Sequence, residues 1–169
     1  MKQKILELLR EYTGHKYVKL TSNGDASIFI ALMIAKGQGK KKVFIPDQGG
    51  WLSYPKLPRL LDMEVEEYKT KLGIIESIKP DKDSVVIVTQ PAGYSGVQDL
   101  KKINKNGALV ILDATGSIGN KEQCNSKYAD IILSSFGKDK PVNLGYGGMI
   151  STDNKEFFES REQIIKIPF

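Results

Sequence analysis

The sequence has almost none of the residues from which disulfides and most metal sites are built. Its 169 residues include one cysteine, Cys124, and one histidine, His15. A single cysteine excludes both an internal disulfide and a cysteine-cluster metal site, and a single histidine argues against a histidine-based metal site within one chain. We therefore expect no metal, and chemistry that depends on other side chains.

Long apolar runs are also missing. No stretch approaches the roughly 18–20 apolar residues that a membrane-spanning helix requires. The N-terminal sequence MKQKILELLREY has the pattern of an amphipathic helix rather than that of a signal peptide. These absences predict a soluble, cytoplasmic protein with no membrane partner.

The positive charge is not organised as it is in nucleic-acid-binding proteins. The chain has 25 Lys and Arg against 20 Asp and Glu, a formal net charge of +5. Its lysines are scattered over turns and helix ends, without an aromatic-interleaved basic stripe or a known nucleic-acid motif. Solvated lysines explain this pattern, and we expect no nucleic-acid partner.

Short apolar runs alternate with helical periodicities along the chain. Strands are predicted at 17–20, 42–46, 64–68, 84–89, 108–112, 130–133 and 145–150, and helices at 2–12, 26–36, 55–63, 72–79 and 97–104, with a short C-terminal helix after the last strand. The alternation predicts a three-layer α/β/α fold with a mostly parallel sheet of about seven strands. The length, without linkers or repeats, predicts a single domain over 1–169.

Chemically useful side chains follow several of the predicted strands. These loops carry Asp25, Trp51, Gln90, Asp113 and the segment 135–140, which holds Lys138 and Lys140. In open α/β sheets, ligands bind beyond the carboxyl ends of the strands, so we expect these residues to meet. An anion site, an aromatic ring, a carboxylate and an amine together suit pyridoxal phosphate, whose aldehyde condenses with lysine and whose ring nitrogen pairs with aspartate.

Several of these features have plainer interpretations. The polar start of the helix at 26–36 suits an anion, but Ser22, Asn23 or Asp25 can equally be its N-cap. Trp51 can be a core residue, Asp113 a turn residue, and the lysines of the 135–140 loop can be solvated.

The order of these motifs resembles the large domain of fold-type I pyridoxal-phosphate enzymes, and most closely the DegT/StrS-type sugar aminotransferases, over about residues 17–151. That group has a Gly-Thr-Ala-like phosphate loop, an aromatic residue after a Val-Pro strand end, an Asp-Ala pair, and Ser-Phe-His-x-x-Lys followed after four residues by Gly-Glu-Gly-Gly. The corresponding segments here are Gly24-Asp25-Ala26, Ile45-Pro46 with Trp51, Asp113-Ala114, Ser135-Phe136-Gly137-Lys138-Asp139-Lys140, and Gly145-Tyr146-Gly147-Gly148.

The resemblance implies a role for each matched residue. Lys140 would form the internal aldimine and later move protons, with Lys138 as the rival lysine, and Asp113 would keep the ring nitrogen protonated. Trp51 would stack on the ring, and Gln90 would reach the ring hydroxyl. The phosphate would be held by the backbone of Gly24, Asp25 and Ala26 and by the hydroxyl of Ser135.

The sequence departs from the family pattern at four matched positions. Asp25 replaces the usual Thr or Ser, Gly116 a Gln or His, Gly137 the His, and Tyr146 the Glu. The smaller C-terminal domain of these enzymes is expected to be absent after Phe169.

Two hypotheses follow from this combination. The chain is either an aminotransferase-like enzyme whose site is completed in a homodimer and takes a small-molecule amino donor, or a catalytically incomplete relic, a scaffold, or one subunit of a split enzyme with a separate C-terminal-domain subunit. A nucleotide-binding domain is a weaker alternative, because no Gly-x-Gly-x-x-Gly follows the first strand.

Overall fold

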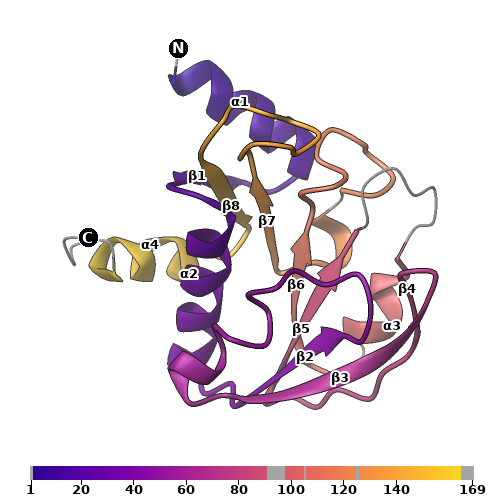
Figure 1. Cartoon of the computed structure of the whole chain (residues 1–169). Coiled ribbons are helices and arrows are strands. Elements are labelled where there is room, and N and C mark those ends of the chain that lie inside the picture. Colours follow the sequence, from indigo (N-terminus) through magenta and orange to yellow (C-terminus); the bar gives the residue numbers. More distant parts are fainter. Residues whose placement is uncertain (1, 91–97, 105, 125, 165–169) are drawn as a thin grey trace.

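The computed structural model describes residues 2–90, 98–104, 106–124 and 126–164. Within these ranges the chain forms one eight-stranded sheet with the strand order β1-β8-β7-β6-β5-β2-β3-β4 (Figure 1). The strands are β1 (Tyr17–Thr21), β2 (Lys42–Pro46), β3 (Glu64–Lys71), β4 (Ile74–Ser77), β5 (Ser84–Thr89), β6 (Leu109–Asp113), β7 (Ile131–Ser135) and β8 (Gly148–Thr152). The α-helices are α1 (Lys2–Thr13), α2 (Gly24–Gly37), α3 (Leu100–Asn104) and α4 (Lys155–Ile164).

The middle of the sheet is parallel and its edges are antiparallel. Strands β7, β6, β5, β2 and β3 run in the same direction, whereas β8 and β1 at one edge and β4 at the other are antiparallel to their neighbours. The predicted mostly parallel sheet is confirmed, with eight strands in place of about seven. The predicted loop at 91–96, and Val97 of the predicted helix 97–104, lie outside the described residues.

Helices pack on both faces of the sheet. Successive residues of a strand point to opposite faces, so each central strand contributes side chains to two cores. On β5, Val85 and Ile87 pack in the core that includes α2 and Phe157 of α4. Val86 and Val88 pack in the second core, which includes residues of α1 and α3. All four strand side chains are fully buried, which explains the uninterrupted apolar run in the sequence.

The predicted helix at 72–79 is wrong, because this segment forms the second half of a β-hairpin. Strands β3 and β4 pair antiparallel with Lys71 opposite Ile74. The two connecting residues, Leu72 and Gly73, have φ values of 51° and 76°. Two consecutive left-handed residues are typical of the tight turn that joins hairpin strands. Gln98 holds the turn in place by donating to Gly73 O at 2.6 Å.

The predicted helix at 55–63 is also wrong in extent. The segment is a series of turns that ends in a short 3₁₀ helix, Arg59–Leu61. Pro55 and Pro58 have no N–H to donate to a helical ladder, and Asp62 ends the segment with a left-handed φ of 51°.

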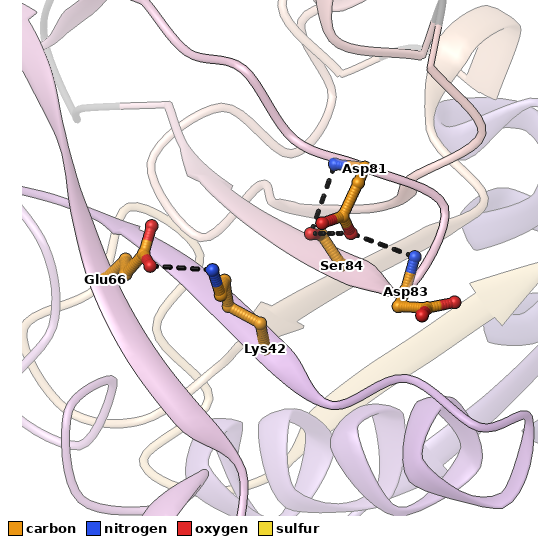
Figure 2. A network of polar contacts seen from close by, with 5 residues as sticks. All are labelled: Lys42, Glu66, Asp81, Asp83 and Ser84. Carbon is orange, nitrogen blue, oxygen red and sulfur yellow. Dashed lines mark hydrogen bonds and ion pairs between the residues drawn. The ribbon is translucent and has the colours of Figure 1, made fainter.

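A polar network closes the amino-terminal edge of the parallel strands (Figure 2). Lys42 at the start of β2 forms a 2.7 Å ion pair with Glu66 of β3. The Asp81 carboxylate accepts from Ser84 Oγ at 2.6 Å and from Asp83 N at 3.0 Å, which fixes the turn into β5. These contacts set the start of the strands, and the cavity described below lies at their other ends.

No helix in the described ranges has both the length and the apolar composition needed to cross a membrane.

His15 joins α1 to the last two strands from a buried position. Its Nε2 donates to Ala129 O at 3.0 Å, and its Nδ1 is 3.0 Å from Ser151 Oγ. Burial lowers the pKa of His15 below its ordinary value of 6.5, against smaller opposing effects of the Ala129 hydrogen bond and of Asp153 and Asp130. Burial therefore disfavours the protonated imidazole in the folded protein.

We expect His15 to make the protein less stable in mild acid. Its stabilising contribution is fully present above pH 6.5 and is lost as the pH falls below that value through the lower folded pKa, because the unfolded chain takes up a proton that the folded chain rejects. Urea unfolding at several pH values, compared between the wild type and His15→Gln, isolates this group. One proton gives a slope of at most about 1.4 kcal/mol per pH unit. An identical pH dependence in both proteins would contradict the assignment.

Candidate functional site

The loops after five strands surround a cavity of about 530 Å³ at the carboxyl ends of the sheet. These loops follow β1, β2, β5, β6 and β7. Eight of the residues selected from the sequence line the cavity, namely Gly24, Asp25, Trp51, Gln90, Asp113, Ser135, Lys138 and Lys140. Ala26 is the one selected residue that does not line it.

Asp113 is the last residue of β6 and is only 7% exposed. Both oxygens of its carboxylate are hydrogen-bonded. Oδ1 accepts from Thr115 N at 3.0 Å, and Oδ2 accepts from the hydroxyl of Tyr54 at 2.6 Å. A buried carboxylate with donors at both oxygens is held in one orientation.

Tyr54 was not among the residues selected from the sequence. It lies in the loop after β2 and is 1% exposed. Its hydroxyl oxygen is 2.9 Å from Thr89 Oγ1. Burial, together with the charge and the hydrogen bond of Asp113, raises the pKa of Tyr54 well above its ordinary value. The sequence placed Tyr54 in a loop, and nothing in the local pattern distinguishes a tyrosine that points inward from one that points to solvent.

Trp51 is held at the mouth of the cavity by Asp25. The Asp25 carboxylate accepts from Trp51 Nε1 at 3.0 Å and from Ser53 Oγ at 2.8 Å. The tryptophan is 46% exposed, so it is not a core residue. The acidic residue that replaces the usual Thr or Ser thus has a local function, which is to fix the aromatic side chain of the neighbouring loop.

Lys140 approaches the same tryptophan from the loop after β7. Its Nζ lies 3.9 Å from the centroid of the Trp51 ring, a distance at which a cation is attracted to the ring face. Lys138 also lines the cavity, and Asp139 between the two lysines has a left-handed φ of 65°. Among these described contacts, only Lys140 has a defined aromatic partner at the site.

The amino terminus of α2 points its first turn at the cavity. Asn23 is the N-cap, because its Oδ1 accepts from Ala26 N at 2.8 Å. The N–H of Ala26 is therefore already used within the helix start. Within the described ranges, the N–H groups of Gly24 and Asp25 have no protein acceptor, and they lie at the positive end of the helix dipole.

The helix start packs closely against Ser135 at the end of β7. A Cβ atom added to Gly24 would lie 2.8 Å from the Cβ of Ser135, so only glycine permits this approach. Ser135 N donates to Thr115 Oγ1 at 3.0 Å, and Ser135 Oγ accepts from Gly137 N at 3.3 Å. Among the described residues, the hydroxyl hydrogen of Ser135 has no acceptor and is available as a donor beside the helix terminus.

The arrangement brings a buried carboxylate, an aromatic ring, two amines and the amino terminus of a helix to one cavity. Within the described ranges there is no cluster of three or more His, Cys, Asp or Glu side chains that could hold a metal ion. The donor set therefore suits an organic, anionic ligand with an aromatic ring.

Solved structures with the same fold include an aminotransferase and a protein with a bound cofactor. The structure of the aminotransferase TlmJ from Streptoalloteichus hindustanus superposes with a TM-score of 0.79 at 17% identity, covering 96% of this chain and 48% of that one. NtdA from Bacillus subtilis, solved with bound cofactor PMP, superposes with a TM-score of 0.73 at 24% identity, covering 92% and 37%.

A sequence relative and a family model agree with this fold. An uncharacterized protein from Methanocaldococcus jannaschii is 26% identical over 166 residues, which are 92% of this chain and 43% of that protein. The chain thus spans less than half the length of each of these three proteins. The model of the DegT/DnrJ/EryC1/StrS aminotransferase family matches residues 2–166. The chain therefore belongs to the DegT/DnrJ/EryC1/StrS aminotransferase family.

Proposed function

We propose that this protein binds pyridoxal phosphate and performs aminotransferase-like chemistry, with Lys140 as the amine that reacts with the cofactor aldehyde and Asp113 as the partner of the ring nitrogen. The observation that carries the proposal is that Lys140 and Asp113, which are 27 positions apart in the sequence, line the same cavity.

The cavity has the size and the donors that this cofactor requires. Its volume of about 530 Å³ lies within the range of small-molecule sites. Trp51 offers a flat surface, and Asp113 offers a buried anion. The free N–H groups of Gly24 and Asp25, with the hydroxyl of Ser135, offer donors to a phosphate. The residues present therefore fit pyridoxal phosphate.

Each residue has a separable task. When bound, pyridoxal phosphate supplies an electrophilic carbonyl and a ring that accepts electrons. The Asp113 carboxylate, already oriented by Thr115 and Tyr54, would hold a proton on the ring nitrogen. Lys140 Nζ would supply the amine and would then move a proton to and from the substrate carbon.

The charge of Asp25 does not prevent phosphate binding in this arrangement. Its Oδ1 is occupied by the two donors from Trp51 and Ser53, which stabilise the charge locally. Its backbone N–H, by contrast, lies at the helix start. Asp25 thus contributes its side chain to Trp51 and its main chain to the anion.

We further propose that a second copy of the chain completes the site. Large apolar side chains are exposed on the loops that border the cavity, with Leu52 at 76%, Leu144 at 60% and Tyr146 at 81% exposure. Exposed apolar groups of this size mark interaction surfaces. A small-molecule amino donor would then enter between the two copies.

A second candidate function is cofactor binding without turnover, as a relic, a scaffold or one subunit of a split enzyme. The observation that favours it is that Gly116 and Gly137 both line the cavity and provide no side chain at positions where the family has Gln or His. Turnover of amino donors by the purified chain would argue against this candidate.

Titration of the full chain with pyridoxal phosphate tests the proposal directly. Trp51 is the only tryptophan, so its fluorescence reports on the cavity alone. We expect saturable quenching of this emission together with a new visible absorbance band of the cofactor. An unchanged cofactor spectrum and unchanged emission would overturn the proposal, whereas binding without reaction toward amino donors would favour the second candidate.

A further inference from the structure

Two buried tyrosines lie beside the central strands and use their hydroxyl groups differently. Tyr68 of β3 donates to the backbone Ile87 O at 2.9 Å, which is an ordinary structural hydrogen bond. Tyr54 instead contacts the Asp113 carboxylate at 2.6 Å and lines the cavity. A tyrosine whose hydroxyl faces a functional carboxylate does more than fill the core.

The direction of the hydrogen bonds in this cluster follows from the carboxylate. Because an ionised carboxylate only accepts, the single hydroxyl hydrogen of Tyr54 points at Asp113 Oδ2. Thr89 Oγ1, 2.9 Å from the same tyrosine oxygen, must then donate to Tyr54. The result is a directed chain from Thr89 through Tyr54 to Asp113, and each bond strengthens the next.

Other donors to the carboxylate are few. Thr115 N occupies the other oxygen of Asp113. Gly116, three residues after Asp113, has no side chain with which to hold it. Among the described side chains, Tyr54 is therefore the only one that donates to this carboxylate, and Asp113 is nearly excluded from water at 7% exposure.

We propose that Tyr54 is the positioning residue for Asp113, and that the Thr89–Tyr54–Asp113 chain keeps the carboxylate anionic so that the proton stays on the ring nitrogen of the bound cofactor. The inference rests on the proposed function of the cavity and adds a residue to it. A strong donor makes a carboxylate a weaker base, so removing the donor moves the shared proton from the ring nitrogen toward Asp113.

The test uses the full chain, cofactor labelled with ¹⁵N in its ring, and the variant Tyr54→Phe. The ring nitrogen resonance is expected to move toward the value of an unprotonated pyridine. The dissociation constant of the cofactor is expected to rise about tenfold, which corresponds to about 1.4 kcal/mol. Tyr68→Phe is the matched control: it also deletes a buried tyrosine hydroxyl, and it should leave the ring resonance unchanged.

Thr89→Val provides a second variant that leaves Tyr54 in place. It removes the donor at the start of the chain, and a smaller shift of the ring resonance in the same direction is expected. If Tyr54→Phe does not fold, the shift measured in Thr89→Val tests the role of Tyr54. Unchanged ring resonance in the variant that folds would overturn the role of Tyr54, and so would an equal shift in Tyr68→Phe. Failure of the wild type to bind the cofactor would instead overturn the proposed function.

Discussion

Replacing Lys140 by alanine is expected to abolish covalent retention of pyridoxal phosphate. Treatment of the wild-type complex with borohydride makes a lysine–cofactor bond permanent, and intact-mass spectrometry should then show one added cofactor per chain. Lys140→Ala should show no added mass under the same conditions. Reversible binding should persist more weakly, because Asp113 and the amino terminus of α2 are unchanged in this variant.

Lys138→Ala is the matched control for this experiment. Lys138 lies in the same loop and lines the same cavity, but the amine above Trp51 is that of Lys140, 3.9 Å from the ring centroid. We expect Lys138→Ala to retain the cofactor as the wild type does. If the added mass were lost in Lys138→Ala and kept in Lys140→Ala, the roles of the two lysines would be exchanged. Peptide mapping of the reduced wild type identifies the modified lysine independently.

The central strands were predictable because their sequences are unambiguous. Strands β2 and β5 have the predicted bounds, since each contains a run of buried β-branched or aromatic residues, 43–45 and 85–88, next to a turn. The hairpin of β3 and β4 was not predictable, because β4 is only four residues long and its isoleucines also fit a helical face. The turn of the hairpin is formed by Leu72 and Gly73. Because leucine rarely adopts the positive φ that this turn requires, the pair does not identify a hairpin in the sequence.

The site was predictable to the extent that topology alone determines it. Residues at the carboxyl ends of parallel strands meet whatever their separation in the sequence, and this placed Trp51, Asp113 and Lys140 at one cavity. The hydrogen bonds within the site were not predictable. Tyr54 and Asp113 are 59 residues apart and Asp25 and Trp51 are 26 apart, and such pairings depend on side-chain directions that a sequence pattern does not contain.

Gly148→Ala is expected to destabilise the fold strongly, because an added methyl group has no room there. A Cβ atom at Gly148 would lie 2.7 Å from Asn23 O, 2.7 Å from Thr21 Oγ1 and 2.8 Å from Asn23 C. Two of these atoms belong to the backbone and cannot rotate away. Gly148 is also paired on both sides, with Thr21 of β1 and with Ser135 of β7, so the strand itself has little room to shift.

We expect Gly148→Ala to lower the free energy of unfolding by about 3 kcal/mol, the upper end of the usual range for overpacking. This is a large fraction of the roughly 5–15 kcal/mol typical of a folded domain. Urea unfolding followed by circular dichroism measures the change. Gly37→Ala is the control, since no atom lies within 4 Å of an added Cβ there and its stability should be unchanged or slightly higher. Equal unfolding midpoints for the two variants would contradict the expectation.

The same substitution links stability to the site. The atoms that the new methyl group would displace belong to Asn23, whose side chain caps α2 and whose position sets where the N–H groups of Gly24 and Asp25 point. A folded Gly148→Ala protein should therefore bind pyridoxal phosphate more weakly while retaining covalent attachment at Lys140. Loss of affinity without loss of attachment would show that the amino terminus of α2 and the Lys140 amine contribute separately to cofactor binding.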